Sequence, residues 1–164
     1  MDSIFFRQAE LLLRILPLVD REDVFALKGG TAINFFVRDF PRLSVDIDLV
    51  YLPVGERDLS LRELSAAMVR ISSDVESRIP GTKIIPKKLK GTDLWSGCSV
   101  RRADATIKIE PNLVMRGSLF PPERRTLSPK ARSVFELSVE CRTLRFYHAF
   151  KKEVHMEKTK HPSI

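Results

Sequence analysis

The sequence predicts one mixed α/β (α+β) domain, because segments with the spacing of strands alternate with segments with the spacing of helices. Polar and apolar side chains alternate over residues 44 to 49, which is the period of a half-buried strand. Apolar side chains recur at helical spacing between residues 61 and 79. At 164 residues, the chain has the length of a single domain that can bury a core of its own.

The first quarter of the chain predicts a helix, a strand and a second helix. Residues 3 to 17 carry apolar side chains at helical spacing, so we expect a helix that packs on the sheet and ends at Pro17. Residues 24 to 27 form a short apolar run that predicts a buried strand, and residues 31 to 38 predict a helix.

Two glycines join that strand to that helix. Gly29 and Gly30 leave the backbone bare just before the helix begins at Thr31. The free N–H groups and the positive end of the helix dipole favour a phosphate at such a turn. A Gly-Gly pair by itself is more often only a turn.

The strand over residues 44 to 49 carries two carboxylates. Asp46 and Asp48 are two residues apart, so both side chains lie on one face while the aliphatic side chains enter the core. Adjacent like charges destabilise the strand unless a cation lies between them, and Mg²⁺ is a cation that binds carboxylate oxygens. An Asp-x-Asp pair by itself is usually a solvated face. Together with the glycine turn, however, it predicts a site for a nucleoside triphosphate with Mg²⁺.

The second half of the chain completes a sheet of about five strands flanked by helices. We expect a long helix over residues 61 to 79, which Pro80-Gly81 ends, and a hairpin over residues 96 to 110. A loop-rich stretch over residues 111 to 129 and a final strand over residues 134 to 139 should follow. Residues 83 to 90 predict an edge strand with clustered lysines. These lysines either block edge-to-edge pairing or track the phosphates of RNA.

The pattern LKGGTAINFF…RLSVDIDLVYLP, from Leu27 to Pro53, resembles a known family. It is similar to the nucleotidyltransferase domain of the AbiEii/AbiGii toxins, within the DNA polymerase β-like nucleotidyltransferase superfamily. The resemblance covers roughly residues 20 to 140, and we expect residues 1–140 to be the nucleotidyltransferase domain. It implies the nucleotidyltransferase fold, two Mg²⁺ ions, an NTP substrate and transfer of NMP to an acceptor.

The resemblance also implies a role for each candidate residue. In the superfamily a third carboxylate comes from a neighbouring strand, and the triplet Lys108-Ile109-Glu110 resembles that position. Glu110 would bind the catalytic metal and activate the acceptor hydroxyl, and Lys108 would contact a phosphate. The alternative is an exposed glutamate paired with Lys108 or an arginine. The implied phosphate contacts are Gly29, Gly30, Thr31 and Lys108, and the implied metal ligands are Asp46, Asp48 and Glu110.

The resemblance implies the toxin half of a toxin–antitoxin or phage abortive-infection system, with a cognate antitoxin, and a tRNA end as a possible acceptor. A net charge of +7 favours RNA as the acceptor, although a protein hydroxyl also fits the site. No apolar run reaches the roughly 20 residues of a membrane span, and we expect no membrane association. Two cysteines without metal-ligand spacing and the absence of a signal-peptide pattern predict a cytoplasmic protein.

The C-terminal residues depart from the family pattern. We expect residues 141–164 to be a partial or truncated C-terminal helical region, in which residues 146 to 151 only partly resemble the family's LYAGK segment. In relatives this region supplies a lysine and an aspartate to the site, and Lys151 is the available substitute for the lysine. Two interpretations therefore remain open: an active transferase, or a catalytically impaired nucleotide- or RNA-binding remnant.

Overall fold

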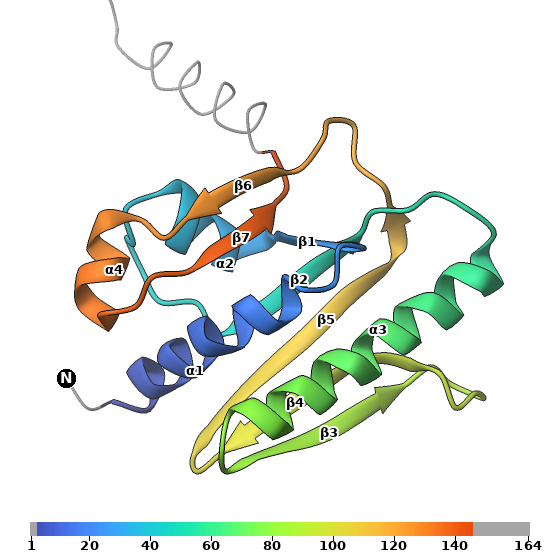
Figure 1. The fold of residues 1–164 in the computed structure, drawn as a ribbon, viewed down its shortest axis with the longest axis horizontal. Helices are drawn as coiled ribbons and strands as arrows, with labels where there is room; N and C mark the ends of the chain where they lie inside the picture. Colours follow the sequence, from blue (N-terminus) through green and yellow to red (C-terminus); the bar gives the residue numbers. More distant parts are fainter. Residues whose placement is uncertain (1–2, 146–164) are drawn as a thin grey trace, which may run out of the picture.

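The computed structural model describes residues 3–145 and contains a seven-stranded mixed sheet with helices packed against it (Figure 1). The strand order is β3-β4-β5-β2-β1-β7-β6. The strands are β1 Phe25–Lys28, β2 Asp46–Tyr51, β3 Thr82–Lys88, β4 Trp95–Arg102, β5 Ala105–Arg116, β6 Glu123–Thr126 and β7 Glu140–Thr143. The helices are α1 Ile4–Val19, α2 Gly29–Ala32 with the π-helical turn η1 Ile33–Val37, α3 Arg57–Arg78 and α4 Pro129–Phe135.

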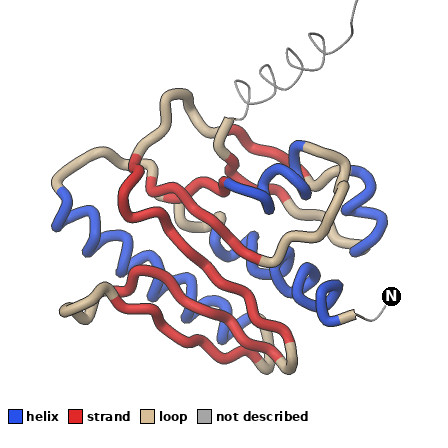
Figure 2. The backbone as a smooth tube through the Cα atoms, turned by 180° about the vertical axis from the view of Figure 1, so that it is seen from behind, coloured by secondary structure: helices blue, strands red, loops and turns tan. Residues whose placement is uncertain are grey.

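The core lies between the sheet and the helices α1 and α3. Ile47 and Leu49 of β2 and Ile107 and Ile109 of β5 are at most 1% exposed, and they face these helices. The opposite face of β3, β4 and β5 carries no helix, as the view from behind shows (Figure 2). The side chains that alternate with the buried aliphatics therefore reach an open surface. No helix within residues 3–145 is long and apolar enough to cross a membrane.

Most of the elements predicted from periodicity are confirmed. The hairpin of β4 and β5 is antiparallel, with Arg102 opposite Ala105 at its turn. The lysine-rich strand β3 lies at the edge of the sheet, and α3 begins a turn earlier than the predicted Leu61. In α1, the Ser3 hydroxyl caps the helix by accepting a hydrogen bond from the Phe6 N–H at 3.2 Å.

The prediction that α1 ends at Pro17 is wrong, because the helix continues to Val19. A proline so close to the end removes only one hydrogen bond of the final turn. Leu18 and Val19 are both buried, and the Asp20 N–H donates to the Leu16 carbonyl at 2.9 Å. Burial of two aliphatic side chains thus outweighs the single lost hydrogen bond.

The predicted final strand over residues 134 to 139 is also wrong, because α4 occupies residues 129 to 135. Ser128 caps this helix by accepting from the Ala131 N–H at 3.3 Å, and Pro129 is pre-formed for its first turn. Phe135 stacks on Phe6 of α1 with ring centroids 4.8 Å apart, and it meets Phe35 of η1 at 6.0 Å. An aromatic cluster across three helical segments therefore stabilises a helix at this position.

The sheet has seven strands rather than about five, because β6 and β7 form where a loop was predicted or no strand was expected. Both strands are polar, and they pair antiparallel with each other from Glu123–Thr143 to Thr126–Glu140. Since β7 also pairs with β1, the sheet extends three residues past residue 140, the predicted end of the domain. Residues 146 to 164, with Lys151 and most of the predicted C-terminal helical region, lie outside the described residues.

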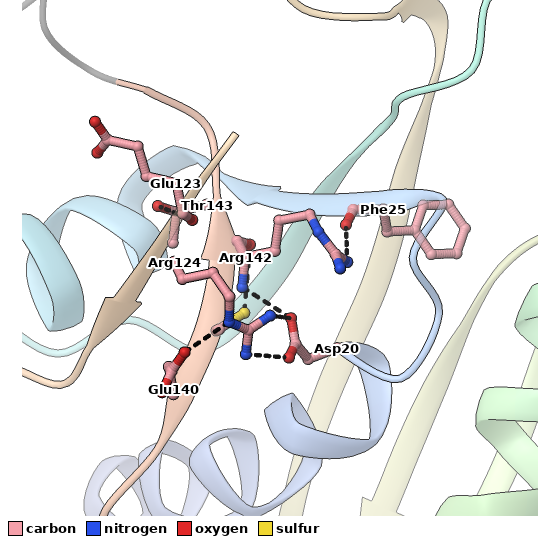
Figure 3. A network of polar contacts seen from close by, with 8 residues as sticks. Asp20, Phe25, Glu123, Arg124, Glu140, Arg142 and Thr143 are labelled. Atoms are coloured by element: carbon pink, nitrogen blue, oxygen red, sulfur yellow. Dashed lines mark hydrogen bonds and ion pairs between the residues drawn. The ribbon is translucent and has the colours of Figure 1, made fainter. Parts of the chain in front are cut away.

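A polar network holds β6 and β7 against the end of α1 (Figure 3). The Arg124 guanidinium donates to both Asp20 carboxylate oxygens, at 2.8 and 3.4 Å, and to Glu140 at 2.6 Å. Asp20 also accepts from the backbone N–H of Arg142 at 2.8 Å, and the Arg142 side chain donates to the Phe25 carbonyl at 3.3 Å. Asp20 is largely shielded from solvent, and its charge-assisted hydrogen bonds join the end of α1 to β6 and β7.

Gly97 of β4 allows β4 and β5 to approach each other closely, and replacing it should weaken the sheet. A Cβ atom at this position would lie 2.7 Å from the Ile109 carbonyl oxygen. We expect Gly97→Ala to lower the free energy of unfolding by about 1–3 kcal/mol, because backbone must move. Urea unfolding measures this loss. Gly55→Ala is the control, since its new Cβ would meet nothing closer than 3.9 Å. Equal stabilities of the two variants would contradict the close approach.

Candidate active site

The chain enters the site at the junction of β1 and α2. Gly29 has φ +76°, a conformation that side chains disfavour, and a Cβ there would lie 2.9 Å from the Asp48 Oδ2 atom. A glycine is therefore required both by the backbone and by the nearby carboxylate. Gly30 is exposed and follows within α2, whose first N–H groups have no partner within the helix. The predicted strand and helix are present, but the helix begins at Gly29 rather than at Thr31, so the two glycines are its first residues.

The three predicted carboxylates lie on one face of neighbouring strands. β2 and β5 pair in parallel, with Asp46 opposite Lys108 and Asp48 opposite Glu110. Paired residues of adjacent strands point to the same face, and such strands are about 4.8 Å apart. The structure thus brings together Asp46, Asp48, Glu110 and Lys108, next to Gly29.

Thr31 has a different environment from the one predicted. Its side chain is 1% exposed, and its hydroxyl lies 2.6 Å from the Ser44 Oγ atom. The same hydroxyl donates to the carbonyl oxygen of Asp46. These bonds fasten the start of β2 to α2, and the Thr31 hydroxyl is engaged within the protein. Contact of the Thr31 backbone N–H with a phosphate stays a prediction.

The family assignment rests on a match between residues 10–148 and the family model described as "Nucleotidyl transferase AbiEii toxin, Type IV TA system". The chain belongs to this AbiEii toxin family. No curated protein matches the sequence significantly. The fold is similar to that of MenT4, a nucleotidyltransferase toxin from Mycobacterium tuberculosis, with a TM-score of 0.50 and 14% identity over 87% of this chain. The matched region is 48% of MenT4, so this AbiEii chain spans about half the length of that toxin.

A second solved structure has a weaker likeness. The enzyme ANT(2″)-Ia, in complex with adenylyl-2″-tobramycin, aligns with a TM-score of 0.37 and 18% identity. The alignment covers 95% of the present chain and 82% of ANT(2″)-Ia.

Lys28 is a further neighbour of the candidate carboxylates, which the sequence patterns did not indicate. It pairs with Asp48 across β1 and β2, so Lys28, Asp48 and Glu110 form one row over three adjacent strands. The only signal in the sequence is its position directly before Gly29. A lysine at the end of a four-residue apolar strand gives no indication of which residue it will face.

The electrostatics of the row centre on Asp48. Partial burial raises the pKa of this carboxyl above its ordinary value of 3.8, Lys28 lowers it, and the neighbouring charges of Asp46 and Glu110 raise it further. Asp48 thus has one lysine and two carboxylates as its charged neighbours. A site of this kind favours the arrival of additional positive charge.

The donors of this site suit Mg²⁺ only in combination with further ligands. Within residues 3–145, no group of three or more Asp, Glu, His or Cys side chains is placed so that it could hold a metal ion by itself. Magnesium, however, is commonly bound by one or two carboxylates, with substrate phosphates and waters completing the octahedron. Asp46, Asp48 and Glu110 offer only hard oxygen ligands, and they fit that arrangement.

The row makes opposite predictions for two substitutions. Lys28→Met should raise the pKa of Asp48, because the cation that favours its ionised form is removed. Asp46→Asn should lower it, because a repelling charge is removed. A pH titration of the carboxyl carbons by NMR measures both shifts. Asp104→Asn is the control, since Asp104 is ion-paired with Arg7 at the far end of the β4–β5 hairpin. Shifts of the same sign in the first two variants would contradict this arrangement.

Proposed function

We propose that this AbiEii protein is a Mg²⁺-dependent nucleotidyltransferase, which moves NMP from an NTP to an acceptor hydroxyl and releases pyrophosphate. The observation that carries the proposal is the parallel pairing of Asp48 with Glu110, on the side of the sheet away from the core and beside Gly29. Carboxylates from two strands and a bare helix start are the two features that phosphoryl chemistry on a triphosphate requires.

The glycine turn would hold the triphosphate. Gly29 and Gly30 present backbone N–H groups at the start of α2, without a side chain to keep a phosphate away. Lys28 and Lys108 lie on either side of the carboxylates and would balance the charge of the phosphates. These contacts orient the α-phosphate, which is the atom group that reacts.

The carboxylates would hold Mg²⁺ and handle the proton. Asp46, Asp48 and Glu110 are the proposed ligands, and the bound metal would supply charge neutralisation at the α-phosphate and at the leaving pyrophosphate. Glu110 is half-buried within β5, opposite Asp48, and would accept the proton of the attacking acceptor hydroxyl. Incoming positive charge would favour the ionised form of Asp48, whose pKa is raised by burial and by two neighbouring carboxylates.

The proposed biological role is that of a toxin controlled by a cognate antitoxin, as the family description of a type IV toxin–antitoxin system suggests. It would act where NTPs are available, in the cytoplasm. A net charge of +7 supports RNA as the acceptor, and a tRNA end is the acceptor that we propose.

Replacement of Asp46 should eliminate transfer without unfolding the protein. We expect Asp46→Asn to lower the transfer rate by at least about a hundredfold, because a proposed ligand of the Mg²⁺ that would neutralise charge at the α-phosphate is lost. The assay incubates the protein with each α-labelled NTP, Mg²⁺ and total tRNA, and follows label on RNA and on protein. Asp104→Asn removes the same charge on the hairpin and should leave the rate unchanged.

The outcomes of this assay separate the interpretations. Label on RNA supports an RNA acceptor. Label on protein would instead identify the reaction as protein nucleotidylation. Wild-type turnover in folded Asp46→Asn would overturn the site. NTP binding without any transfer by the wild type would identify a nucleotide-binding remnant instead of an enzyme.

A further inference from the structure

The sheet continues beyond the carboxylates as an exposed, cation-bearing surface. We use the name open sheet face for the side of β3, β4 and β5 that points away from α3 (Figure 2). Strand register determines which side chains reach it. Lys83 pairs with Arg101, and Ile85 pairs with Ser99, which in turn pairs with Lys108. The side chains that define the open sheet face are Lys83, Ile85, Lys87, Ser99, Arg101 and Lys108.

This face is continuous with the candidate active site. Lys108 of β5 pairs with Asp46 of β2, so the cations and the carboxylates point to the same side of one sheet. The alternate residues point the other way: Cys98 is buried beneath α3, with its sulfur 3.8 Å from the Ser72 hydroxyl, and Val100 is fully buried. The orientation of the open sheet face therefore follows from the core and not from flexible side chains.

Within residues 3–145, the cations of the open sheet face lack the ion pairs that several arginines elsewhere on the protein form. Arg7, Arg70 and Arg124 each form an ion pair with a carboxylate at 2.5 to 2.8 Å. In the described part of the chain, the four cations Lys83, Lys87, Arg101 and Lys108 are exposed and none takes part in an ion pair of this kind. Lys108 lies beside Asp46, whereas Lys83, Lys87 and Arg101 are farther from the carboxylates and leave a positive potential on their part of the face.

Protection of the sheet edge accounts for only part of this pattern. β3 is an edge strand, and its lysines and Pro86 would hinder edge-to-edge pairing. Arg101 and Lys108, however, lie on β4 and β5, whose two edges are both paired. Charges on interior strands do not protect an edge.

The spread of the cations indicates a chain-like anion. From the carboxylates of β2 to the lysines of β3 there are three strand spacings, roughly 14 Å. A single triphosphate at Gly29 would leave the outer cations without a partner, whereas a strand with regularly spaced phosphates would engage them in turn. Ile85, which is 37% exposed among these charges, adds an apolar surface for a base.

We propose that the open sheet face binds the phosphodiester backbone of a single-stranded nucleic acid and leads its terminal hydroxyl to Glu110. The binding itself needs no NTP and no metal; only the placement of the hydroxyl rests on the proposed nucleotidyl transfer. The acceptor strand would cross β3, β4 and β5 in that order and reach the carboxylates at its end.

The test compares two triple variants that each lose three positive charges. Lys83→Gln/Lys87→Gln/Arg101→Gln alters the open sheet face but no proposed catalytic residue. Arg57→Gln/Arg62→Gln/Arg78→Gln alters exposed arginines of α3, on the opposite side of the sheet. Fluorescence anisotropy with a labelled 12-nucleotide RNA, and with DNA of the same sequence, gives Kd for each protein at several KCl concentrations.

We expect the open-face variant to bind at least about tenfold more weakly than the wild type, and the α3 variant to bind nearly as well. The slope of log Kd against log salt should fall in magnitude by about 2 in the open-face variant, since each phosphate contact contributes about 0.7 for a single strand. The strand that binds more tightly, RNA or DNA, identifies the acceptor class.

Three results would overturn the inference: an unchanged Kd in the open-face variant, an equal loss in both variants, or no binding of either strand by the wild type. The proposed chemistry is judged separately, by binding of Mg²⁺–NTP to the same three proteins. Retained NTP binding with lost RNA binding supports both proposals. If none of the three proteins binds Mg²⁺–NTP while RNA binding is as expected, the proposed nucleic-acid surface stands and the proposed nucleotidyl transfer is wrong.

Discussion

The parallel pairing of β2 with β5 is the constraint on which the candidate site depends. Side chains alternate along a strand, so a slip by one residue would move Asp48 or Glu110 into the core. The register is set by burial, because Ile47 and Ile109 are fully enclosed beneath the helices. The hydrophobic core thus fixes the alignment of the carboxylates, although it contributes no atom to the chemistry.

A second constraint is the tight junction that joins the glycine turn to β2. Gly29 leaves room for the Asp48 carboxylate, and the buried Thr31 hydroxyl holds the backbone at Asp46. The backbone that would bind phosphate and the side chains that would bind metal are therefore parts of one rigid unit. Its electrostatic cost appears in the raised pKa of Asp48, which Lys28 offsets only in part. Such imbalance is typical of sites that acquire their remaining charge with the substrate.

The elements that the sequence predicted well are those whose pattern reports burial directly. Alternation in β2 identified the face shared by Asp46 and Asp48, and the helical spacing identified α1 and α3, whereas Glu110 was indicated by the family resemblance. The polar strands β6 and β7 were not predictable in this way, because they form by pairing with each other and through the Arg124 network. Lys28 was missed for a related reason: its partner is set by tertiary register rather than by local composition.

The most direct test of the account is a crystal structure of the protein with Mn²⁺ and a non-hydrolysable NTP. The anomalous signal of Mn²⁺ locates the metal independently of the protein atoms. The account predicts metal density between Asp46, Asp48 and Glu110, with the triphosphate on the backbone of Gly29 and Gly30. A triphosphate bound elsewhere, or metal density away from these carboxylates, would contradict the claim that the β2–β5 register builds the active site.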